Sequence, residues 1–239
     1  MKIISWNCNG GFREKFHALE SLNADIFIIQ ECEDPSQAKS IQYSEWANDY
    51  LWAGKSKHKG IGVFAKKGNR VKQIELATES LKIFLPFTIN DDLNVLAVWT
   101  QETESGAFRY IGQMWQYLQL HKNFFKSNNH LIIGDFNSNK IWDRKRNIAN
   151  HSHVVDELKE IGISSSYHHI YGCDQGNELH PTFYMYRKLE KPYHIDYAFA
   201  SENIIKNSNV EIGSPDQWLN YSDHMPLIFT VNTLNSNCL

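Results

Sequence analysis

The stretch Leu131–Asn137, LIIGDFN, runs from three apolar residues through a glycine into a carboxylate, an aromatic ring and an amide. A continuous apolar run of this kind is typical of a strand that is buried on both faces. Such a strand does not ordinarily end on two polar side chains, Asp135 and Asn137, placed two residues apart. A turn in which Asp135 accepts backbone N–H bonds is one explanation, and a site for chemistry at the strand end is the other.

Outward from this stretch, the sequence predicts more strands than helices. Apolar or alternating runs indicate strands at residues 2–7, 25–31, 60–67, 70–76, 81–89, 93–100, 130–135, 193–201 and 226–231. Spacings of three and four indicate helices at residues 12–23, 106–126 and 153–162. The dipeptide Asp91–Asp92 is a plausible hairpin turn between two of these strands. We therefore expect an α/β fold in which two mixed sheets pack face to face with helices outside.

The length and composition fit one domain. The chain has 239 residues, 42% of them hydrophobic, which suits a single large domain with a full core. We expect this domain to span residues 1–232 and a polar C-terminal tail to occupy residues 233–239. No apolar window is long enough to span a membrane, and the N-terminal run is too short for a signal peptide. A cytoplasmic monomer without membrane contact is therefore expected.

Charge and cysteine content exclude two classes of site. The net charge of −3 argues against a generally basic surface, so nucleic acid would have to bind through a local patch. The four cysteines form no CxxC pair, which argues against a zinc knuckle and favours reduced thiols.

Several predicted strands carry a polar side chain at or near one end. These residues are Asn7, Glu31, Asp135 with Asn137, Asp196, and the pair Asp223–His224. Each has a structural explanation as a cap, a solvated strand end or a loop pair, although a carboxylate inside the strand at Asp196 needs a partner. In layered α/β folds, ligands gather beyond the carboxyl ends of strands. The joint occurrence therefore predicts one shared site.

Five short motifs in this order resemble a known family. They are SWNCNG (residues 5–10), IIQE (28–31), GDFN (134–137), HIDY (194–197) and SDHMP (222–226). Together they are similar to the signature of the endonuclease/exonuclease/phosphatase superfamily, which includes exonuclease III and other abasic-site endonucleases, pancreatic deoxyribonuclease, neutral sphingomyelinases and inositol polyphosphate 5-phosphatases. The resemblance implies a four-layer sandwich of two packed mixed β-sheets flanked by helices, which agrees with the strand pattern.

The resemblance also implies a Mg²⁺-dependent hydrolase of phosphate esters, with Mn²⁺ as a possible substitute. A set of oxygen donors suits Mg²⁺, which is a hard cation. Glu31 would be the principal metal ligand, with Asn7 and Asp223 near the metal. Asp135 would orient or deprotonate the attacking water. Three further residues complete the implied catalytic set: Asn137 on the nucleophile and the phosphate, and Asp196 paired with His224, which donates to a phosphoryl oxygen.

Two segments match the family less closely. Abasic-site endonucleases carry a Tyr and an Asn in the region that here reads VLAVWTQE, and other branches carry a His. This chain places Val98 near the Tyr position and Gln101 near the Asn or His position, where Gln101 can hydrogen-bond phosphate. The motif HPTF carries His180, either as a substrate contact or as part of a turn set by Pro181. The missing Tyr weakens the case for abasic DNA.

Two basic clusters bear on the substrate. One is KSKHKG, with Lys55, Lys57 and Lys59, and the other is KIWDRKR, with Lys140, Trp142, Arg144, Lys145 and Arg146. The second follows Asp135 closely and offers cations to a polyanion and a ring for stacking. Ordinary exposed lysines on loops are the alternative. A nuclease requires both clusters on the rim of the site.

These observations lead to a main hypothesis and two alternatives. The main hypothesis is a Mg²⁺-dependent nuclease that hydrolyses phosphodiester bonds in DNA by metal-assisted in-line attack of water. The first alternative is a phosphodiesterase or phosphatase acting on a small phosphorylated substrate. The second is a non-catalytic phosphate-binding module, which the complete set of catalytic residues disfavours.

Overall fold

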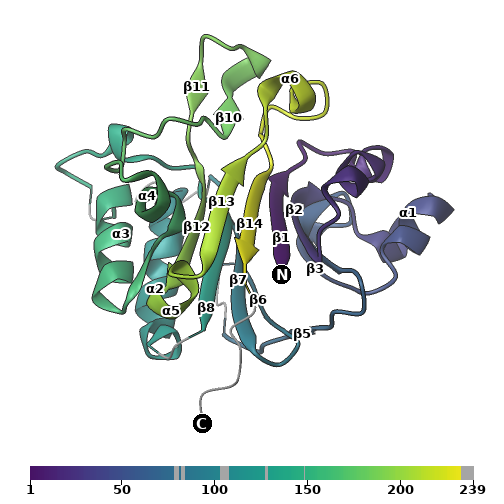
Figure 1. Cartoon of the computed structure of the whole chain (residues 1–239), viewed down its shortest axis with the longest axis horizontal. Coiled ribbons are helices and arrows are strands. Elements are labelled where there is room, and N and C mark those ends of the chain that lie inside the picture. The colour runs from purple at the N-terminus through teal and green to yellow at the C-terminus, as the bar shows by residue number, and fades with distance from the viewer. Residues whose placement is uncertain (78–80, 82–83, 103–107, 127–128, 148, 233–239) are drawn as a thin grey trace.

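The computed structural model describes the whole chain except residues 78–80, 82–83, 103–107, 127–128, 148 and 233–239. Two six-stranded sheets dominate the fold (Figure 1). The first sheet has the order β13 (Ser208–Ile212), β14 (Leu227–Val231), β1 (Lys2–Asn7), β2 (Ile26–Cys32), β4 (Lys59–Ala65) and β3 (Tyr50–Ser56). The second has the order β5 (Val71–Gln73), β6 (Phe84–Ile89), β7 (Leu93–Trp99), β8 (His130–Asp135), β12 (Asp196–Ser201) and β9 (Ile163–Ser165).

Both sheets are mixed, as the sequence predicts. β1 and β2 are parallel in the first sheet, β7 and β8 are parallel in the second, and the other paired strands run antiparallel. β10 (Phe183–Tyr184) and β11 (Pro192–Tyr193) form a separate hairpin that projects from one end of the molecule in Figure 1. The predicted turn at Asp91 is confirmed as the β6–β7 hairpin, where Asn90 and Asp91 have positive φ.

Helices cover the outer faces of the two sheets. The helices are α1 (Ile41–Trp46), α2 (Ile111–Phe125), α3 (His151–Glu160), α4 (Ser166–Tyr171), α5 (Glu202–Ile205) and α6 (Pro215–Trp218). The 3-10 segments are η1 (Phe12–Glu14), η2 (Phe16–Leu22), η3 (Pro35–Gln37), η4 (Lys140–Trp142) and η5 (Met185–Arg187). In Figure 1, α2 and α3 lie on one side of the paired sheets and α1 lies on the other. This arrangement confirms the four-layer sandwich.

The alternation of β1 divides its side chains between two apolar cores. Ile3 lies in the core between the sheets, whereas Ile4 and Trp6 lie in a second core under η1, η2 and α1. Because successive strand residues point to opposite faces, every residue of β1 after Lys2 is buried. An apolar strand that is buried on both faces therefore delivers Asn7 at its end.

Gly134 allows β8 to lie against β7. A Cβ atom at this position would lie 2.0 Å from the carbonyl oxygen of Val98, and the φ angle of +149° also favours glycine. Val98 is the residue that pairs with Gly134 in the parallel register. The glycine therefore sets the close approach of the two strands immediately before Asp135.

The structure corrects three predicted elements. The helix expected at residues 12–23 is two 3-10 segments separated at Lys15, whose ammonium donates to the carbonyl of Cys8 at 2.7 Å. The helix expected at 106–126 is α2, which begins only at Ile111 because Tyr110 has a positive φ of 49°, and residues 106–107 lie outside the described part of the chain. The strand expected at 193–201 begins at Asp196 because the backbone N–H groups of Ile195 and Asp196 bond to a threonine hydroxyl instead of a neighbouring strand.

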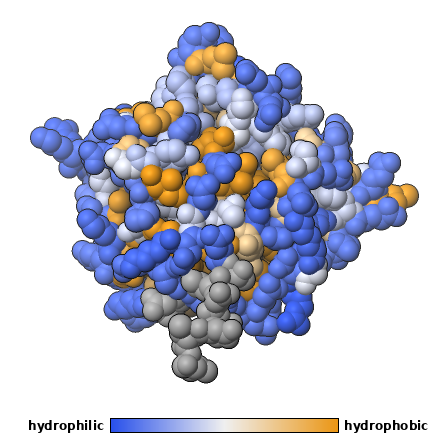
Figure 2. All heavy atoms as spheres, viewed as in Figure 1, coloured by the Kyte–Doolittle hydropathy of each residue, from blue (hydrophilic) through white to orange (hydrophobic). Residues whose placement is uncertain are grey.

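The surface seen in Figure 2 is mainly hydrophilic, with apolar residues in scattered groups. Within the described residues, each helix is too short or too polar to cross a lipid bilayer. The predicted tail at residues 233–239 lies outside the described residues, and the assignment of residues 1–232 to one catalytic domain stays a prediction.

Candidate active site

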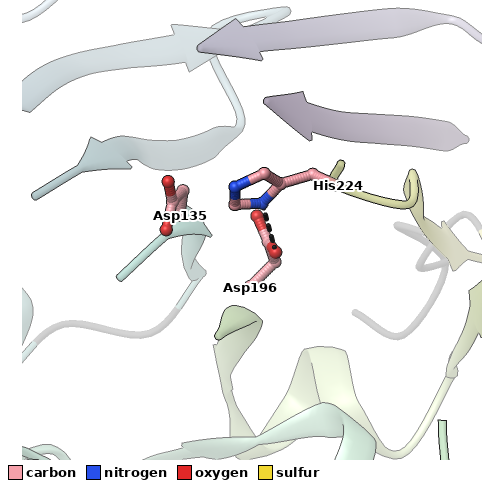
Figure 3. A group of neighbouring side chains, drawn as sticks. All are labelled: Asp135, Asp196 and His224. Carbon is pink, nitrogen blue, oxygen red and sulfur yellow. Dashed lines mark hydrogen bonds and ion pairs between the residues drawn. The ribbon is translucent and has the colours of Figure 1, made fainter. Parts of the chain in front are cut away.

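Two buried carboxylates and an imidazole form the centre of the site. Asp135 ends β8 and Asp196 begins β12, and the two residues are direct partners in the antiparallel register. His224 Nδ1 lies 3.0 Å from Asp196 Oδ2. One nitrogen or oxygen atom from each of the three side chains lies within 4.8 Å of the others. Figure 3 shows the three side chains grouped together, with the bond between His224 and Asp196 dashed. All three residues are at most 5% exposed, so water screens their interactions weakly.

Backbone contacts fix the orientation of His224. The hydroxyl of Ser222 accepts the N–H of His224 at 3.0 Å and donates to the carbonyl oxygen of Asn7 at 2.7 Å. The indole of Trp6 donates to the carbonyl of His224 at 2.9 Å. The SDH loop is therefore tied to the end of β1, which explains why motifs far apart in the sequence meet here.

Thr182 fixes the backbone at Asp196 through hydrogen bonds, as Ser222 and Trp6 do at His224. Its hydroxyl oxygen accepts the backbone N–H groups of Ile195 and Asp196 at 2.9 and 3.0 Å. The residue is fully buried, and neither bond was foreseen from the sequence because Thr182 and Asp196 are joined through the β10–β11 hairpin. Thr182 thus belongs to the site as a positioning residue.

Asp135 is surrounded by amides. Its Oδ1 accepts the backbone N–H of Asn137 at 2.8 Å, and its Oδ2 accepts the side-chain amides of Asn137 at 2.8 Å and Asn7 at 3.0 Å. The first of these bonds closes an Asp turn, so the structural explanation of GDFN is correct. The same turn gives Asn137 a φ of +46° and directs its amide to the carboxylate and to the carbonyl of Thr100. The turn therefore does not exclude a site for chemistry at this strand end, which stays a prediction.

Glu31 lies in a bulge of β2. The register shifts between Gln30 and Cys32, and Glu31 between them has a φ of +63°. Asn7 Nδ2 lies 3.4 Å from Glu31 Oε1, and Lys59 Nζ lies 2.5 Å from Glu31 Oε2. The bulge turns the side chain of Glu31 toward Asn7, as is common for bulges next to active sites.

Burial and neighbouring charges raise the pKa values of both Asp135 and His224. The raised pKa favours the neutral form of Asp135 and the charged form of His224. Burial raises the pKa of Asp135 to about 7, against the lowering effect of His224 and the bonded amides. Burial alone would lower the pKa of His224, but the carboxylates of Asp196 and Asp135 raise it to about 9. At neutral pH, His224 is therefore a cation beside a carboxylate that is close to its own titration point.

The site contains donors that fit a divalent cation. Asp135, Asp196 and His224 are close enough to share an ion, but His224 Nδ1 is already bonded to Asp196 and its raised pKa keeps the ring protonated. The carboxylate of Glu31 fits a hard ion such as Mg²⁺ better. Asn7 directs its amide nitrogen toward Glu31, and its Oδ1 accepts the N–H of Asn9 at 3.0 Å, so its amide would have to turn to offer an oxygen to the ion. The ammonium of Lys59 on Glu31 Oε2 indicates that this position attracts a cation.

The remaining predicted residues are divided between the site and its surroundings. Asp223 is half-buried between Ser222 and His224, and its Oδ1 lies 3.5 Å from the hydroxyl of Ser222. Gln101 follows Thr100, and the side-chain amide of Gln113 bonds to the backbone of Gln101 at 2.8 and 3.3 Å. The predicted residues Trp142 and Arg144, but not Lys140, line a groove that also contains Asn137.

His180 lies next to two tyrosines. Its Nδ1 lies 2.8 Å from the hydroxyl of Tyr167, and its ring centre lies 4.8 Å from that of Tyr171. Among the described residues, no contact joins His180 to the Asp135–His224 group. A direct role for His180 in substrate binding stays a prediction.

Tyr110 was missed by sequence analysis. It precedes α2 and lines the groove that contains Asn137, and its pKa is raised by burial and by nearby carboxylates that include Asp135. The family comparison placed the tyrosine position at Val98, which is buried opposite Gly134. No local signal at Tyr110 identifies it, because its approach to Asp135 depends on the connection between β7 and α2.

Comparison with known proteins agrees with the fold. The sequence model of the endonuclease/exonuclease/phosphatase family matches residues 4–224. Among solved structures, the chain is similar to an AP endonuclease from Archaeoglobus fulgidus, with a TM-score of 0.73 and 16% identity over 97% of this chain and 99% of that chain. It is also similar to the 3′ phosphatase NExo from Neisseria bound to a product DNA hairpin, with a TM-score of 0.71 and 16% identity over 97% and 99% of the two chains. A search of curated protein sequences found no match.

Together, the fold and these comparisons define a hydrolase with a phosphoesterase fold. The chain belongs to the endonuclease/exonuclease/phosphatase family. The structural likenesses, at 16% identity, establish the fold, and the family match contains four of the motifs and the first three residues of the fifth, SDHMP.

Proposed function

We propose that this protein is a Mg²⁺-dependent phosphodiesterase that acts as a nuclease on DNA. The observation that carries the proposal is the contrast between two paired carboxylates. Asp196 is bonded to a cationic imidazole, whereas Asp135 is held by amides and has a pKa of about 7. A base with this pKa is matched to proton transfer at neutral pH.

Asp135 is the base in this account. It holds a water molecule, takes a proton from it as the water oxygen bonds to phosphorus, and the bond from phosphorus to the leaving oxygen breaks on the opposite side. Asn137 donates to the nucleophile or to a phosphoryl oxygen. His224 is fixed through Nδ1 to Asp196 and donates from Nε2 to the phosphoryl oxygen on which charge develops.

Glu31, Asn7 and Asp223 would hold the metal in this site. When bound, Mg²⁺ neutralises the charge that develops on the phosphoryl group and on the leaving oxygen. Lys59 contacts Glu31, and its side chain, which is 53% exposed, can move to a substrate phosphate. Mn²⁺ has similar ligand preferences and is expected to substitute.

The positions of the basic clusters favour a nucleic acid. Lys59, from the first cluster, contacts Glu31, and Arg144, from the second, lines the groove that contains Asn137. Cations from both clusters therefore lie next to residues of the proposed catalytic centre, which supports binding of a polyanion. The net charge of −3 predicts a short contact along the DNA rather than a long one.

A small phosphorylated substrate is the second candidate. The groove beside Asn137 has a volume of about 700 Å³, which is within the range of pockets that bind small molecules.

We further expect the protein to be a monomer and to be located in the cytoplasm.

Cleavage of labelled DNA tests the proposal. A duplex with one abasic site, an undamaged duplex and a panel of small phosphate esters are incubated with Mg²⁺, with Mn²⁺ or with chelator. Metal-dependent cleavage of DNA supports the nuclease assignment, and cleavage of small esters alone supports the second candidate. No hydrolysis of any phosphate ester would refute the proposal and favour a non-catalytic phosphate-binding module.

A further inference from the structure

A groove leads away from the catalytic centre on the side of Asn137. One wall is the N-terminal end of α2, the floor is the chain that follows Asp135, and the other wall is η4 with the loop after it. Its volume of about 700 Å³ exceeds what water attack at Asp135 requires. The groove therefore has room for a part of the substrate beyond the reacting phosphate.

An aromatic row joins this groove to His224. The ring centre of Phe183 lies 4.7 Å from that of His224, and Tyr193 lies 6.4 Å from Phe183. Trp142 packs on Tyr193 at 5.0 Å, and 44% of Trp142 is exposed. A large apolar ring held at the lip of a groove is suited to stack with a flat ligand.

The charges of the groove favour an anion. The carboxylate of Asp143 is hydrogen-bonded to the first turn of α3, where it accepts the N–H groups of His151 and Ser152 at 2.9 and 3.0 Å. Glu102 is paired with Arg109 at 3.0 Å. Arg144 and Arg146 have no ion-pair partner within the described part of the chain. Glu102 is thus paired with a cation, the carboxylate of Asp143 is hydrogen-bonded to the backbone, and two arginines are left for a ligand.

The backbone around Arg144 is held in place. Asn150 Nδ2 donates to the carbonyl of Arg144 at 2.8 Å, and Asn150 Oδ1 accepts the N–H of Arg144 at 3.3 Å. Asn150 therefore ties down the backbone of Arg144, and Asn139 caps η4 by accepting the N–H of Ile141 at 3.0 Å. An exposed ring next to two cations that are unpaired among the described residues has the chemistry of a nucleotide site.

We propose that the groove binds an unpaired nucleotide of a DNA strand next to the bond that is cleaved. Its base stacks on Trp142, and its phosphate lies against Arg144 and Arg146. This inference rests on the proposed nuclease function and narrows it to a substrate class. A base inside a duplex is already stacked on its neighbours and must be unstacked before it can reach Trp142. DNA with a single-stranded end or an unpaired position next to the cleavage site is therefore the preferred substrate.

Binding measurements on Asp135→Asn protein test the inference without turnover. Fluorescence anisotropy compares labelled DNA that carries a single-stranded 3′ overhang with a blunt duplex of the same length, and a mononucleotide is added as competitor. Trp142→Ala in this background is expected to weaken binding of the overhang roughly tenfold or more and to leave the blunt duplex nearly unchanged. Trp142→Phe keeps a ring and is expected to retain most of the affinity.

The salt dependence of DNA binding tests the contribution of Arg144 and Arg146. Arg144→Gln with Arg146→Gln is expected to reduce the slope of log affinity against log salt by roughly one to two for the overhang substrate. Arg70→Gln is the matched control, because Arg70 is equally a surface arginine but lies next to β5, where its guanidinium is paired with Asp91. This control is expected to leave the salt slope unchanged.

The outcomes separate this inference from the proposed function. Equal binding of both DNAs, or overhang binding that Trp142→Ala leaves intact in correctly folded protein, would overturn the inference even if the wild-type enzyme cleaves DNA. Tight binding of the mononucleotide without preference for the overhang would overturn the assignment to a strand. Binding of the overhang that depends on Trp142, with no hydrolysis by wild-type protein and Mg²⁺, would support the groove and refute the phosphodiesterase.

Discussion

Asp135 and Asp196 are directly opposed across β8 and β12, so two buried carboxylates share one face of the second sheet. Their surroundings are different. Asp196 faces the imidazole of His224, and Asp135 faces the amides of Asn7 and Asn137. Two like charges this close oppose each other's ionisation. Because Asp196 is paired with the cationic His224, Asp135 is the carboxylate that exchanges a proton near neutral pH.

Replacement of Asp135 tests this division. Asp135→Asn keeps the shape of the side chain and one acceptor oxygen but removes the base, and we expect turnover to fall by roughly 10²–10⁴-fold. The thermal midpoint of the protein in chelator at pH 8 is expected to fall only modestly, because the loss of a buried charge offsets part of the cost of placing the new NH2 group against the amides of Asn7 and Asn137. Single-turnover rates and thermal melts check both statements. Rates close to those of the wild type would remove Asp135 from the mechanism.

The stability of metal-free protein is expected to decrease as pH rises from 6 to 9. The pKa of His224 is about 9 in the folded protein, above its unfolded value of about 6.5. The stabilisation from its proton is therefore complete below about pH 6.5 and is lost as pH rises through 9. The pKa of Asp135 is also raised, from an unfolded value near 3.9 to about 7, and it acts in the same direction at lower pH.

Asp196→Asn is the matched test of the His224 effect. Without the carboxylate, the pKa of His224 falls, and the loss of stability between pH 7 and 9 is expected to become smaller. Thermal melts in chelator across this pH range measure the change for both proteins. A midpoint that rises with pH in the wild type, or an unchanged profile in Asp196→Asn, would contradict the assignment of the proton to His224.

Lys59 is expected to compete with the metal. Its ammonium lies 2.5 Å from Glu31 Oε2, so a cation bound at Glu31 must displace it. Lys59→Met should therefore tighten Mn²⁺ binding by up to about fivefold, the equivalent of about 1 kcal/mol for a partly exposed pair. Electron paramagnetic resonance titration of Mn²⁺ measures this without substrate.

Lys55→Met serves as the control for Lys59→Met. Lys55 belongs to the same basic cluster on β3 and is exposed, so its removal changes the net charge equally. If both variants shift Mn²⁺ affinity alike, the effect is general charge and the contact with Glu31 is not the cause.

Gly134→Ala tests the strand contact that delivers Asp135. The added Cβ would lie 2.0 Å from the carbonyl of Val98, so β7 and β8 would have to separate. We expect a loss of roughly 3 kcal/mol or more in the free energy of unfolding, a size reached only by a few mechanisms such as overpacking and strain. Gly68→Ala is the control, since Gly68 also has positive φ but open space around it, and about 1 kcal/mol is expected. Urea unfolding that gives equal losses would show that backbone strain alone is responsible.

Sequence reasoning succeeded where the apolar pattern was continuous. The runs that end at Asn7 and Asp135 match β1 and β8 at both ends, because strands buried on both faces show an uninterrupted apolar signal. The helix expected at residues 12–23 was wrong because Phe12, Phe16 and Leu19 satisfy the spacing of a helix and of consecutive 3-10 turns alike. Lys15, which separates the two segments, donates to the carbonyl of Cys8, and the residue spacing gives no sign of this contact.

The sequence predicted the residues at the centre of the site, but it did not predict the residues that hold them in position. Motifs at strand ends identified Asp135, Asp196 and His224, which the structure brings together. Thr182 and Lys59 contact the site through the β10–β11 and β3–β4 hairpins, and such contacts depend on the path of the chain in three dimensions. The positive φ of Glu31 could not be predicted from the sequence either, because IIQE continues an ordinary strand pattern up to the bulge.

Hydrolysis in ¹⁸O-labelled water tests the central claim most directly. DNA with a single-stranded 3′ overhang is cleaved once with Mg²⁺, and the products are analysed by mass spectrometry. The account predicts one ¹⁸O atom on the product phosphate for each bond broken, none on the sugar hydroxyl, and no product with chelator. Label on the hydroxyl, cleavage without incorporation of label into phosphate, or no cleavage would contradict attack of water on phosphorus beside Asp135.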